Sequence, residues 1–284
     1  MKLLLTGCTG FIGKELIPLL IKEGHSLTVI SRQSKEKLKD LGSNQSINAI
    51  QMNPAESASW KQEVIQNSLK NCEGIINLAG EPIAEKRWTE DHCKEITNSR
   101  LETTKNLIEN LRNLKKPPKV LINASAIGFY GSHPQTEFTE ESLPGNDFLA
   151  SLCKRWETIA SNKPRATRLV VVRIGIVLAK DGGALGKMLP IFRAGLGGPI
   201  GDGKQWMSWI HRTDLCNLIN ESVHNSSFSG VINGVAPNPV RMKEFAYLLG
   251  KALGRPSLLA VPGQILKLLL GDGARVVLEG QNVQ

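Results

Sequence analysis

Three glycines near the start of the chain restrict how it can fold. Gly7, Gly10 and Gly13 follow the apolar residues 2–5 and lead into residues 11–23, where leucine and isoleucine recur at helical spacing. Glycines between a strand and a helix permit a tight turn, a close backbone approach to a pyrophosphate and close helix–strand packing. The helix N-terminus adds N–H donors and a positive dipole end for phosphates. The segment therefore predicts a dinucleotide-binding βαβ unit.

The first half of the chain continues to alternate between strand and helix patterns. Strands are expected at residues 26–31, 46–52, 74–78, 120–124 and 167–174, and helices from about Ser34 and at 60–69, 88–114 and 147–160. Such alternation builds right-handed βαβ units around a parallel sheet with both faces covered. We therefore expect an α/β cofactor-binding domain over residues 1–174.

The pattern changes after Arg173, where glycines become frequent and the elements become shorter. Residues 175–284 are expected to form mainly a smaller lobe that packs over the strand ends. Within the stretch 206–235, residues 207–210 and 230–233 could instead return to the main sheet, and the pattern leaves both arrangements open.

Composition excludes several other classes of protein. Hydrophobic residues make up 41% and charged residues 21%, which argues against a disordered chain, a collagen or a coiled coil. No apolar run reaches the roughly 18 residues that a membrane span needs, and Thr6 and Gly7 interrupt the first run too early for a signal peptide. Five cysteines without a Cys-x-x-Cys pair argue against a disulfide framework or a zinc site. We expect a cytoplasmic protein with reduced thiols and no metal.

The net charge of +9 raises the question of nucleic acid. The basic residues are spread along the expected helices, and no helix-turn-helix or RNP motif is present. Nucleic-acid binding is therefore not expected, whereas an anionic cofactor or substrate could draw on the same field.

The end of the second strand distinguishes between cofactors. NAD sites place an acidic residue there for the ribose 2′-hydroxyl, but this chain has Ser31 and Arg32 after Val29 and Ile30. A guanidinium can hold a 2′-phosphate with two hydrogen bonds, so we predict NADP(H) rather than NAD(H). Ser31 and Lys35 are candidate helpers. The alternative is that Arg32 is a surface residue that begins a loop.

Further motifs carry a family resemblance over the whole chain. Residues 77–80 follow the fourth strand and Ser125 follows the fifth, an arrangement that resembles the extended short-chain dehydrogenases/reductases. More narrowly, the chain resembles the atypical epimerase-family or "cell division inhibitor"-like NAD(P)-binding proteins. The stretches that carry this narrower resemblance are residues 80–83, 86–88, 98–100, 126–131, 153–157 and 206–211.

The resemblance implies a Rossmann-type doubly wound parallel sheet with a small C-terminal α/β substrate lobe. Together with the motifs above, it gives an expected cofactor set of Thr6, Gly7, Thr9, Gly10, Phe11, Ile12, Gly13, Ser31, Arg32, Lys35, Leu78, Ala79, Gly80, Glu81, Ala124 and Arg173. The expected substrate set is Ile83, Arg87, Gly203, Gln205, Trp206 and His211. Members of the subgroup usually continue beyond the residue at which this chain stops, which suggests that a last helix is missing.

The family's usual catalytic pair is absent. Its mechanism uses a tyrosine, a lysine four residues later that lowers the tyrosine pKa, and a serine after the fifth strand. Aligning the expected helix on Glu157 puts Leu149 and Cys153 at the pair's positions, and aligning it on Lys154 puts Ala150 at the tyrosine position. The chain has only two tyrosines, and neither lies in this helix.

Ser125 is retained and is the first catalytic candidate. Tyr130 lies five residues later in a glycine-flanked loop, where it could either donate a proton or pack against the substrate or a lid. Cys153 is interpreted as a core residue rather than a nucleophile, because cysteines inside helices are normally buried.

The lobe offers candidates for substrate contacts. His211 precedes Thr213 and Asp214, which are expected to open a helix; alternatively, His211 or Arg212 faces a substrate phosphate or carboxylate. Trp206 and Trp209 point to opposite sides of an expected strand, so at most one lines the cleft. Further positive charge for an anionic substrate, such as a nucleotide-sugar, could come from Arg87, Arg100, Lys187 and Arg193.

Two functions are compatible with these patterns. The first is an NADP(H)-binding epimerase or reductase that acts on a nucleotide-sugar or another carbonyl-type small molecule, with Ser125 and Tyr130 in place of the usual pair. The alternative is a catalytically inactive NADP(H)-binding regulator or interaction protein, for example in cell division. The sequence leaves the oligomeric state open.

Overall fold

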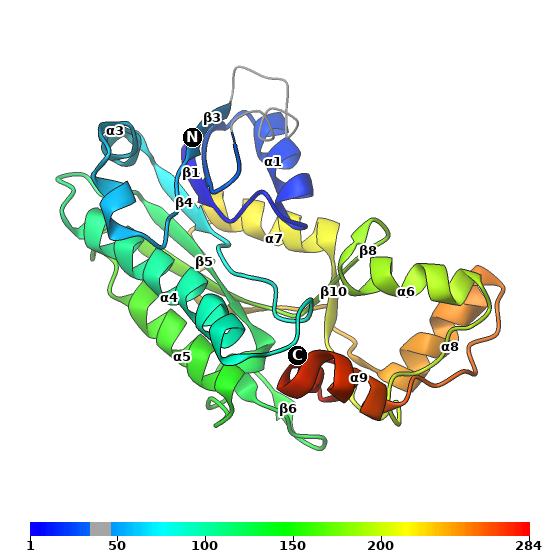
Figure 1. Ribbon diagram of the computed structural model, residues 1–284. Coiled ribbons are helices and arrows are strands. Elements are labelled where there is room, and N and C mark those ends of the chain that lie inside the picture. Colours follow the sequence, from blue (N-terminus) through cyan, green and yellow to red (C-terminus); the bar gives the residue numbers. More distant parts are fainter. Residues whose placement is uncertain (35–46) are drawn as a thin grey trace.

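A parallel sheet of seven strands forms the centre of the molecule (Figure 1). The computed structural model describes residues 1–34 and 47–284, so Lys35 and most of the helix expected from about Ser34 lie outside the described residues. In spatial order the strands are β11 (Gly230–Gly234), β7 (Arg168–Ile174), β5 (Val120–Ala126), β4 (Gly74–Asn77), β1 (Lys2–Thr6), β2 (Ser26–Ser31) and β3 (Ile47–Gln51). The prediction of a Rossmann-type α/β sheet is confirmed, with strand order reversing between β1 and β4.

Helices cover both faces of this sheet, and the sequence of β1 explains why. Leu3 and Leu5 pack with α1 (Gly13–Lys22) and α7 (Arg212–His224), whereas Leu4 packs in the other cluster. That second cluster includes α3 (Glu63–Asn71) and α4 (Glu90–Arg112), and α5 (Phe148–Ser161) lies beside α4 in Figure 1. Neighbouring leucines of a strand point to opposite faces, so an uninterrupted apolar run fits a strand that is buried on both sides.

The helix expected at residues 60–69 is divided in the structure. A 3-10 turn, η1 (Ser57–Lys61), precedes α3, because Gln62 has an extended backbone with φ −62° and ψ 136°. Trp60 is 1% exposed, and its indole N–H donates to the carbonyl oxygen of Pro54 at 2.8 Å. The α-helix therefore begins three residues later than periodicity predicts, at Glu63, and ends at Asn71.

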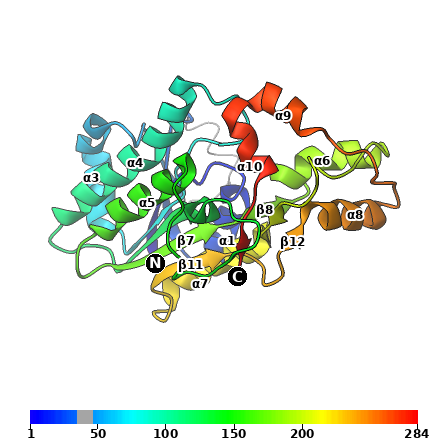
Figure 2. The ribbon, with the colours of Figure 1, turned by 90° about the horizontal axis from the view of Figure 1, so that it is seen from below.

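The chain after β7 supplies a second group of elements, which lies at one end of the molecule in Figure 2. Its elements are β8 (Ile176–Ala179), α6 (Gly183–Arg193), β9 (Trp206–Met207), β10 (Trp209–His211), β12 (Val240–Arg241), α8 (Met242–Leu253), α9 (Gly263–Leu270), η3 (Gly271–Ala274), α10 (Arg275–Leu278) and β13 (Asn282–Val283). Of the two segments that could return to the main sheet, only residues 230–234 do so, as β11. β9 pairs with β12 and β10 pairs with β8.

The last residues described fold back toward the sheet. β13 pairs with β6 (Glu137–Phe138), and Val283 is fully buried. A Cβ atom on Gly280 would lie 2.0 Å from the carbonyl oxygen of Trp206, so only glycine fits where this segment crosses β9. In the described residues, no helix has both the length and the apolar character needed to cross a membrane.

Substitutions at Gly13 and Gly10 should differ sharply in their effect on the free energy of unfolding. A Cβ atom on Gly13 would lie 1.7 Å from the carbonyl oxygen of Cys8, whereas one on Gly10 meets only the carbonyl oxygen of Gly7, at 3.9 Å. We expect Gly13→Ala to lower the free energy of unfolding by about 3 kcal/mol or more, because a backbone clash cannot be relieved by a rotamer change. Urea denaturation measures this, and Gly10→Ala is the matched control. Equal stability of the two variants would contradict the packing described here.

Candidate functional site

The functional region lies where β1 and β4 end side by side at the carboxyl edge of the sheet. Gly7 follows β1 with φ +70°, and a Cβ atom there would lie 2.4 Å from the backbone of Leu78 and Ala79. This close approach requires glycine. In open α/β sheets, ligands bind at this edge, beside the point where the strand order reverses.

A buried chain of polar side chains fixes these strand ends. The Thr6 hydroxyl donates to Oδ1 of Asn77 at 2.6 Å, and Nδ2 of Asn77 donates to Asn123 at 2.7 Å and to Thr104 at 2.9 Å. The Trp156 indole N–H also donates to the Thr104 hydroxyl, at 2.8 Å. Buried polar groups are stable when they are satisfied in this way, and such networks hold a single arrangement. Thr6 is therefore placed in this network, and it lines neither of the two hollows at this edge of the sheet.

The first of two hollows, here called the glycine-loop groove, has a volume of about 700 Å³. It runs along the strand ends past the glycine loop. Residues from the expected cofactor set that line it are Gly7, Thr9, Gly10, Ser31, Arg32, Ala79, Gly80 and Glu81. Residues 53–55, which follow β3 after Met52, also line the groove and were missed by the sequence analysis.

The charged groups of the groove contact one another. Arg32 lies 3.3 Å from Oε2 of Glu81, and Lys86 lies 3.4 Å from Oε1 of the same carboxylate. Partial burial opposes ionisation of Glu81, but the hydrogen bonds and charges of Arg32 and Lys86 outweigh it and lower its pKa. Two cations and one carboxylate thus meet at the end of β2, where the sequence predicted a phosphate contact.

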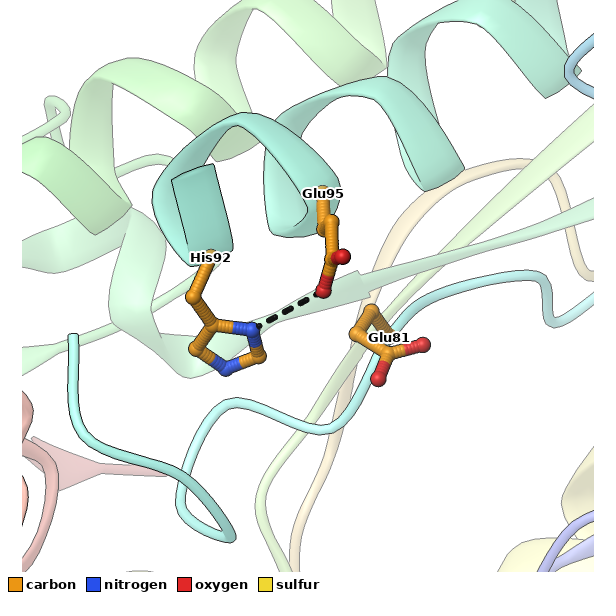
Figure 3. A group of neighbouring side chains, drawn as sticks. All are labelled: Glu81, His92 and Glu95. Atoms are coloured by element: carbon orange, nitrogen blue, oxygen red, sulfur yellow. Dashed lines mark hydrogen bonds and ion pairs between the residues drawn. The ribbon is translucent and has the colours of Figure 1, made fainter. Parts of the chain in front are cut away.

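Glu81 also lies beside His92 and Glu95 (Figure 3). Nδ1 of His92 is 3.3 Å from Oε2 of Glu95, and Lys86 is 4.0 Å from that same oxygen. Glu81 meanwhile holds Arg32 and Lys86. The carboxylates of this cluster are therefore engaged by cations of the protein, and we assign it no metal.

The second hollow is a cavity of about 310 Å³ between the end of β5, α5 and the C-terminal segment. It meets the groove at Ala79 and Gly80, which line both. Residues from the expected sets that line it are Ile12, Leu78, Ala79, Gly80, Ile83, Ala124, Ser125 and Trp206. Trp209 is not among the lining residues, in agreement with the expectation that at most one of the two tryptophans lines the cleft.

Ser125 belongs to a hydrogen-bonded network behind the cavity wall. Its hydroxyl donates to Oε1 of Glu157 at 2.6 Å. Arg173 binds the same carboxylate through two hydrogen bonds, at 2.9 and 2.8 Å. Arg173, expected in the cofactor set, is 4% exposed and lines neither hollow, because its guanidinium is used to hold Glu157.

Tyr130 lies in the same network and not on the cavity wall. It is 1% exposed, accepts a hydrogen bond from Arg173 at 3.0 Å and donates to Oδ1 of Asn233 at 2.6 Å. Burial raises the pKa of its phenol, although Arg173 and Asn233 act in the opposite direction. Of the two roles considered for Tyr130, this position favours packing over proton donation.

The positions of the missing catalytic pair face the cavity. Leu149 and Cys153 lie one helical turn apart on α5, and both line the wall beside Ser125. Burial, followed by the nearby Glu157 charge, raises the pKa of the Cys153 thiol to about 11. The thiol is therefore protonated at neutral pH, which agrees with its interpretation as a core residue.

Four of the six expected substrate residues do not line the cavity. His211 caps α7 by accepting from the Thr213 amide at 3.2 Å, a capping role that the sequence analysis had expected of Thr213 or Asp214. Arg87 donates to the Leu268 carbonyl, and Gln205 donates to two carbonyl oxygens of the lobe. Gly203, with φ +71°, packs against Lys243.

Arg212, Phe11, Lys187 and Arg193 also lie away from the two hollows. Arg212 pairs with Glu15 at 2.6 Å and with Asp181 at 2.9 Å, and its guanidinium covers the Phe11 ring. Phe11 in turn packs against Gly182 and Gly183. Arg212 and Phe11 thus join the glycine loop to the lobe and are not available to a substrate in this arrangement.

Comparison with known proteins agrees with this geometry. The sequence model of the NAD dependent epimerase/dehydratase family matches residues 3–229. The chain belongs to this family. The Arabidopsis thaliana protein described as "Epimerase family protein SDR39U1 homolog, chloroplastic" is 44% identical over 285 residues, which cover 100% of this chain and 80% of that protein.

Solved structures show the same family fold. The crystal structure of human epimerase family protein SDR39U1 (isoform 2) with NADPH has a TM-score of 0.85 and 35% identity, and the match covers 100% of this chain and 90% of that one. UDP-glucuronic acid 4-epimerase from Bacillus cereus has a TM-score of 0.76 at 19% identity, with 98% of both chains covered. At that identity the likeness concerns the fold alone.

Several residues of the site were missed by the sequence analysis. Lys86 was noted only as part of a family motif, and Glu157 only as an alignment anchor. The cavity wall formed by residues 275–281 had no local signal, because it depends on where the lobe packs. A signal for residues 53–55 did exist, since they follow a strand whose carboxyl end meets the same sheet edge.

Gly10→Val should weaken cofactor binding strongly without unfolding this protein. The Cβ position of Gly10 has no close neighbour in the protein, but it faces the groove where a pyrophosphate would approach the loop. We expect NADPH affinity to fall at least about tenfold, as measured by fluorescence titration, with an unchanged melting temperature. Normal NADPH binding by this variant would show that the glycine loop is only a structural turn.

Proposed function

We propose that the protein is an NADP(H)-dependent enzyme that acts on a carbonyl-type small molecule, and that its proton path differs from the usual tyrosine–lysine pair. One observation carries the proposal. The glycine-loop groove and the cavity meet at Ala79 and Gly80, so a dinucleotide in the groove can reach the cavity wall that holds Ser125. The NADPH-bound structure of the human relative supports the choice of cofactor.

The groove has the chemistry that such a cofactor needs. Gly7 and Gly10 leave the loop backbone open to a pyrophosphate, and Arg32 and Lys86 offer positive charge for a 2′-phosphate. Arg100 adds a third cation behind Gly80: its guanidinium carbon would lie 2.8 Å from a Cβ atom on that glycine. When bound, NADP(H) supplies or accepts a hydride.

Ser125 is the proposed proton-handling residue. Within the part of the chain that the structure describes, it is the only hydroxyl group that lines the cavity. Because its proton is donated to Glu157, its oxygen presents lone pairs to the cavity until the hydroxyl turns. Reduction of a carbonyl would require that turn, so that Ser125 donates to the substrate oxygen and Glu157 retains its two hydrogen bonds from Arg173. The proton that passes to the substrate oxygen would be restored to Ser125 from water.

The same geometry gives specific support to the alternative, an NADP(H)-binding regulator without turnover. Leu149 and Cys153 supply neither the phenol nor the cation of the usual pair, and the Ser125 proton is already engaged. Cofactor binding without consumption of NADPH across a set of carbonyl substrates would favour the regulator.

We propose a cytoplasmic setting, which the five free thiols support, although the Arabidopsis relative is described as chloroplastic.

Cofactor preference should depend on Arg32. We expect NADPH to bind at least tenfold more tightly than NADH, and Arg32→Asp to erase that preference, because the new carboxylate would repel a 2′-phosphate. Fluorescence titration with both cofactors measures the ratio. Arg193→Asp makes the same change of charge on an exposed arginine outside the groove and should leave the ratio unchanged. Equal affinities in the unmutated protein would overturn this assignment.

Turnover should depend on Ser125 and very little on Tyr130. We expect Ser125→Ala to lower kcat by about 10²-fold or more, the scale for loss of a proton-transferring group. Tyr130→Phe should change kcat less than about threefold, because the lost hydroxyl is buried between Arg173 and Asn233. NADPH consumption followed by absorbance gives both values. A comparable loss in both variants would assign the acid role to Tyr130 instead.

A further inference from the structure

The wall of the cavity is mostly apolar and rich in aromatic rings. Its lining includes Trp88, Phe148, Leu149, Leu152, Trp156 and Trp206. The rings of Trp88 and Phe148 meet edge to face, with their centroids 5.2 Å apart. Such a wall favours an apolar, ring-containing ligand, because binding removes apolar surface from water on both sides.

The charged groups at this wall are already used by the protein. Arg275 and Glu279 form two hydrogen bonds with each other, at 2.9 and 3.2 Å. The Asp147 carboxylate caps α5 by accepting from the Ala150 amide at 2.8 Å. Arg100 also lines the cavity, beside Gly80; its guanidinium donates to the backbone carbonyl oxygens of Glu81 and Ile96 and lies over the Trp156 ring. Among the described residues, the wall therefore has two arginines: Arg275 is paired with Glu279, and Arg100 alone would have to neutralise a second diphosphate, which carries more charge than one guanidinium.

The small volume of the cavity also argues against a second diphosphate there. Its volume of about 310 Å³ is at the lower end of the range of roughly 300–1,000 Å³ for small-molecule sites. Under the proposed function, the nicotinamide end of the cofactor takes part of this space next to Ser125. A nucleotide-sugar would have to place a diphosphate and a nucleoside in the remainder, and desolvation of that charge would be unfavourable.

We infer that the substrate is a small, uncharged carbonyl compound with an apolar ring, and not a nucleotide-sugar. This inference rests on the proposed function, because it assigns the second ligand of the same site. The carbonyl oxygen would lie toward Ser125, and the ring would pack against Trp88 and Phe148. Phe148 is therefore a residue that determines specificity, while the proton step remains with Ser125.

Binding should be measured directly, so that it does not depend on turnover. The NADPH-saturated protein is titrated in a calorimeter with cyclohexanone, camphor and 1-tetralone as uncharged probes, and with UDP-glucose and UDP-glucuronic acid as charged ones. We expect at least one ketone to bind, with a negative heat-capacity change, and tighter than either nucleotide-sugar by tenfold or more. Tighter binding of a nucleotide-sugar, or no binding of any ketone, would overturn the inference.

A matched pair of variants tests the assigned wall. Phe148→Asn should weaken ketone binding about tenfold or more, because it removes one of the two rings that meet at the ligand position. Leu143→Asn changes a leucine that is 83% exposed and outside the cavity lining, and it should have no effect. Phe148 is itself 38% exposed, so its variant should fold; unchanged melting temperature and NADPH affinity verify this. Equal ketone affinity in the two variants would contradict the assignment.

The two proposals fail in different ways. Ketone binding without NADPH consumption supports the apolar site and contradicts the proposed enzyme. Consumption of NADPH with a nucleotide-sugar supports the enzyme and overturns the apolar site.

Discussion

The arrangement around the cavity depends on a buried ion pair between Arg173 on β7 and Glu157 on α5. The guanidinium binds both carboxylate oxygens, donates to Tyr130 and to the Glu140 carbonyl, and lies 3.4 Å from the centre of the Phe129 ring. Burial opposes the charged form of Arg173, but its hydrogen bonds to Glu157 and Tyr130 outweigh burial and raise its pKa. Removal of one partner from such a pair costs about 3–5 kcal/mol, because the other charge stays buried.

This ion pair determines what Ser125 can do. Glu157 is fixed by Arg173, so it remains a ready acceptor for the Ser125 proton at 2.6 Å. In the usual family mechanism, a lysine would hold the tyrosine in its reactive state from the cavity side. In the part of the chain that the structure describes, the only guanidinium that binds Glu157 is that of Arg173, and it lies behind the cavity wall. The residues of α5 that face the cavity at the positions of the pair are Leu149 and Cys153. The polar side chain that α5 contributes to this network, Glu157, therefore lies behind the cavity wall.

Local signals predicted the parts of the site that short segments build by themselves. Gly7 and Gly10 act within one strand–turn–helix unit, and Arg32 directly follows a strand, so sequence was enough to place these three at the groove. Gly13, from the same unit, packs against Cys8 and does not line the groove. Tyr130 is different, because its five-residue distance from Ser125 does not fix its orientation. The 3-10 turn η2 (Ile127–Tyr130) directs the phenol toward Asn233, which is 103 residues later in the chain.

The residues expected to contact the substrate were the hardest to predict, because their positions also depend on contacts between segments far apart in the sequence. Arg87, Gln205 and His211 look like ligand contacts in sequence, but each meets a backbone group of the protein: a lobe carbonyl for Arg87 and Gln205, and the first turn of α7 for His211. The wall is instead completed by residues 275–281, which reach it only because the chain folds back over β9 at Gly280. Periodicity and motif spacing carry no information about such a crossing.

We expect cofactor choice in the groove to depend on a balance between two cations and one carboxylate. Glu81 forms ion pairs with both Arg32 and Lys86. A 2′-phosphate carries more negative charge than a single carboxylate and can replace Glu81 as the partner of Arg32 through two parallel hydrogen bonds. A 2′-hydroxyl would leave the pairs with Glu81 in place and gain little from either cation. The carboxylate thus raises the charge that a ligand needs in order to compete, which favours the phosphorylated cofactor over the plain one.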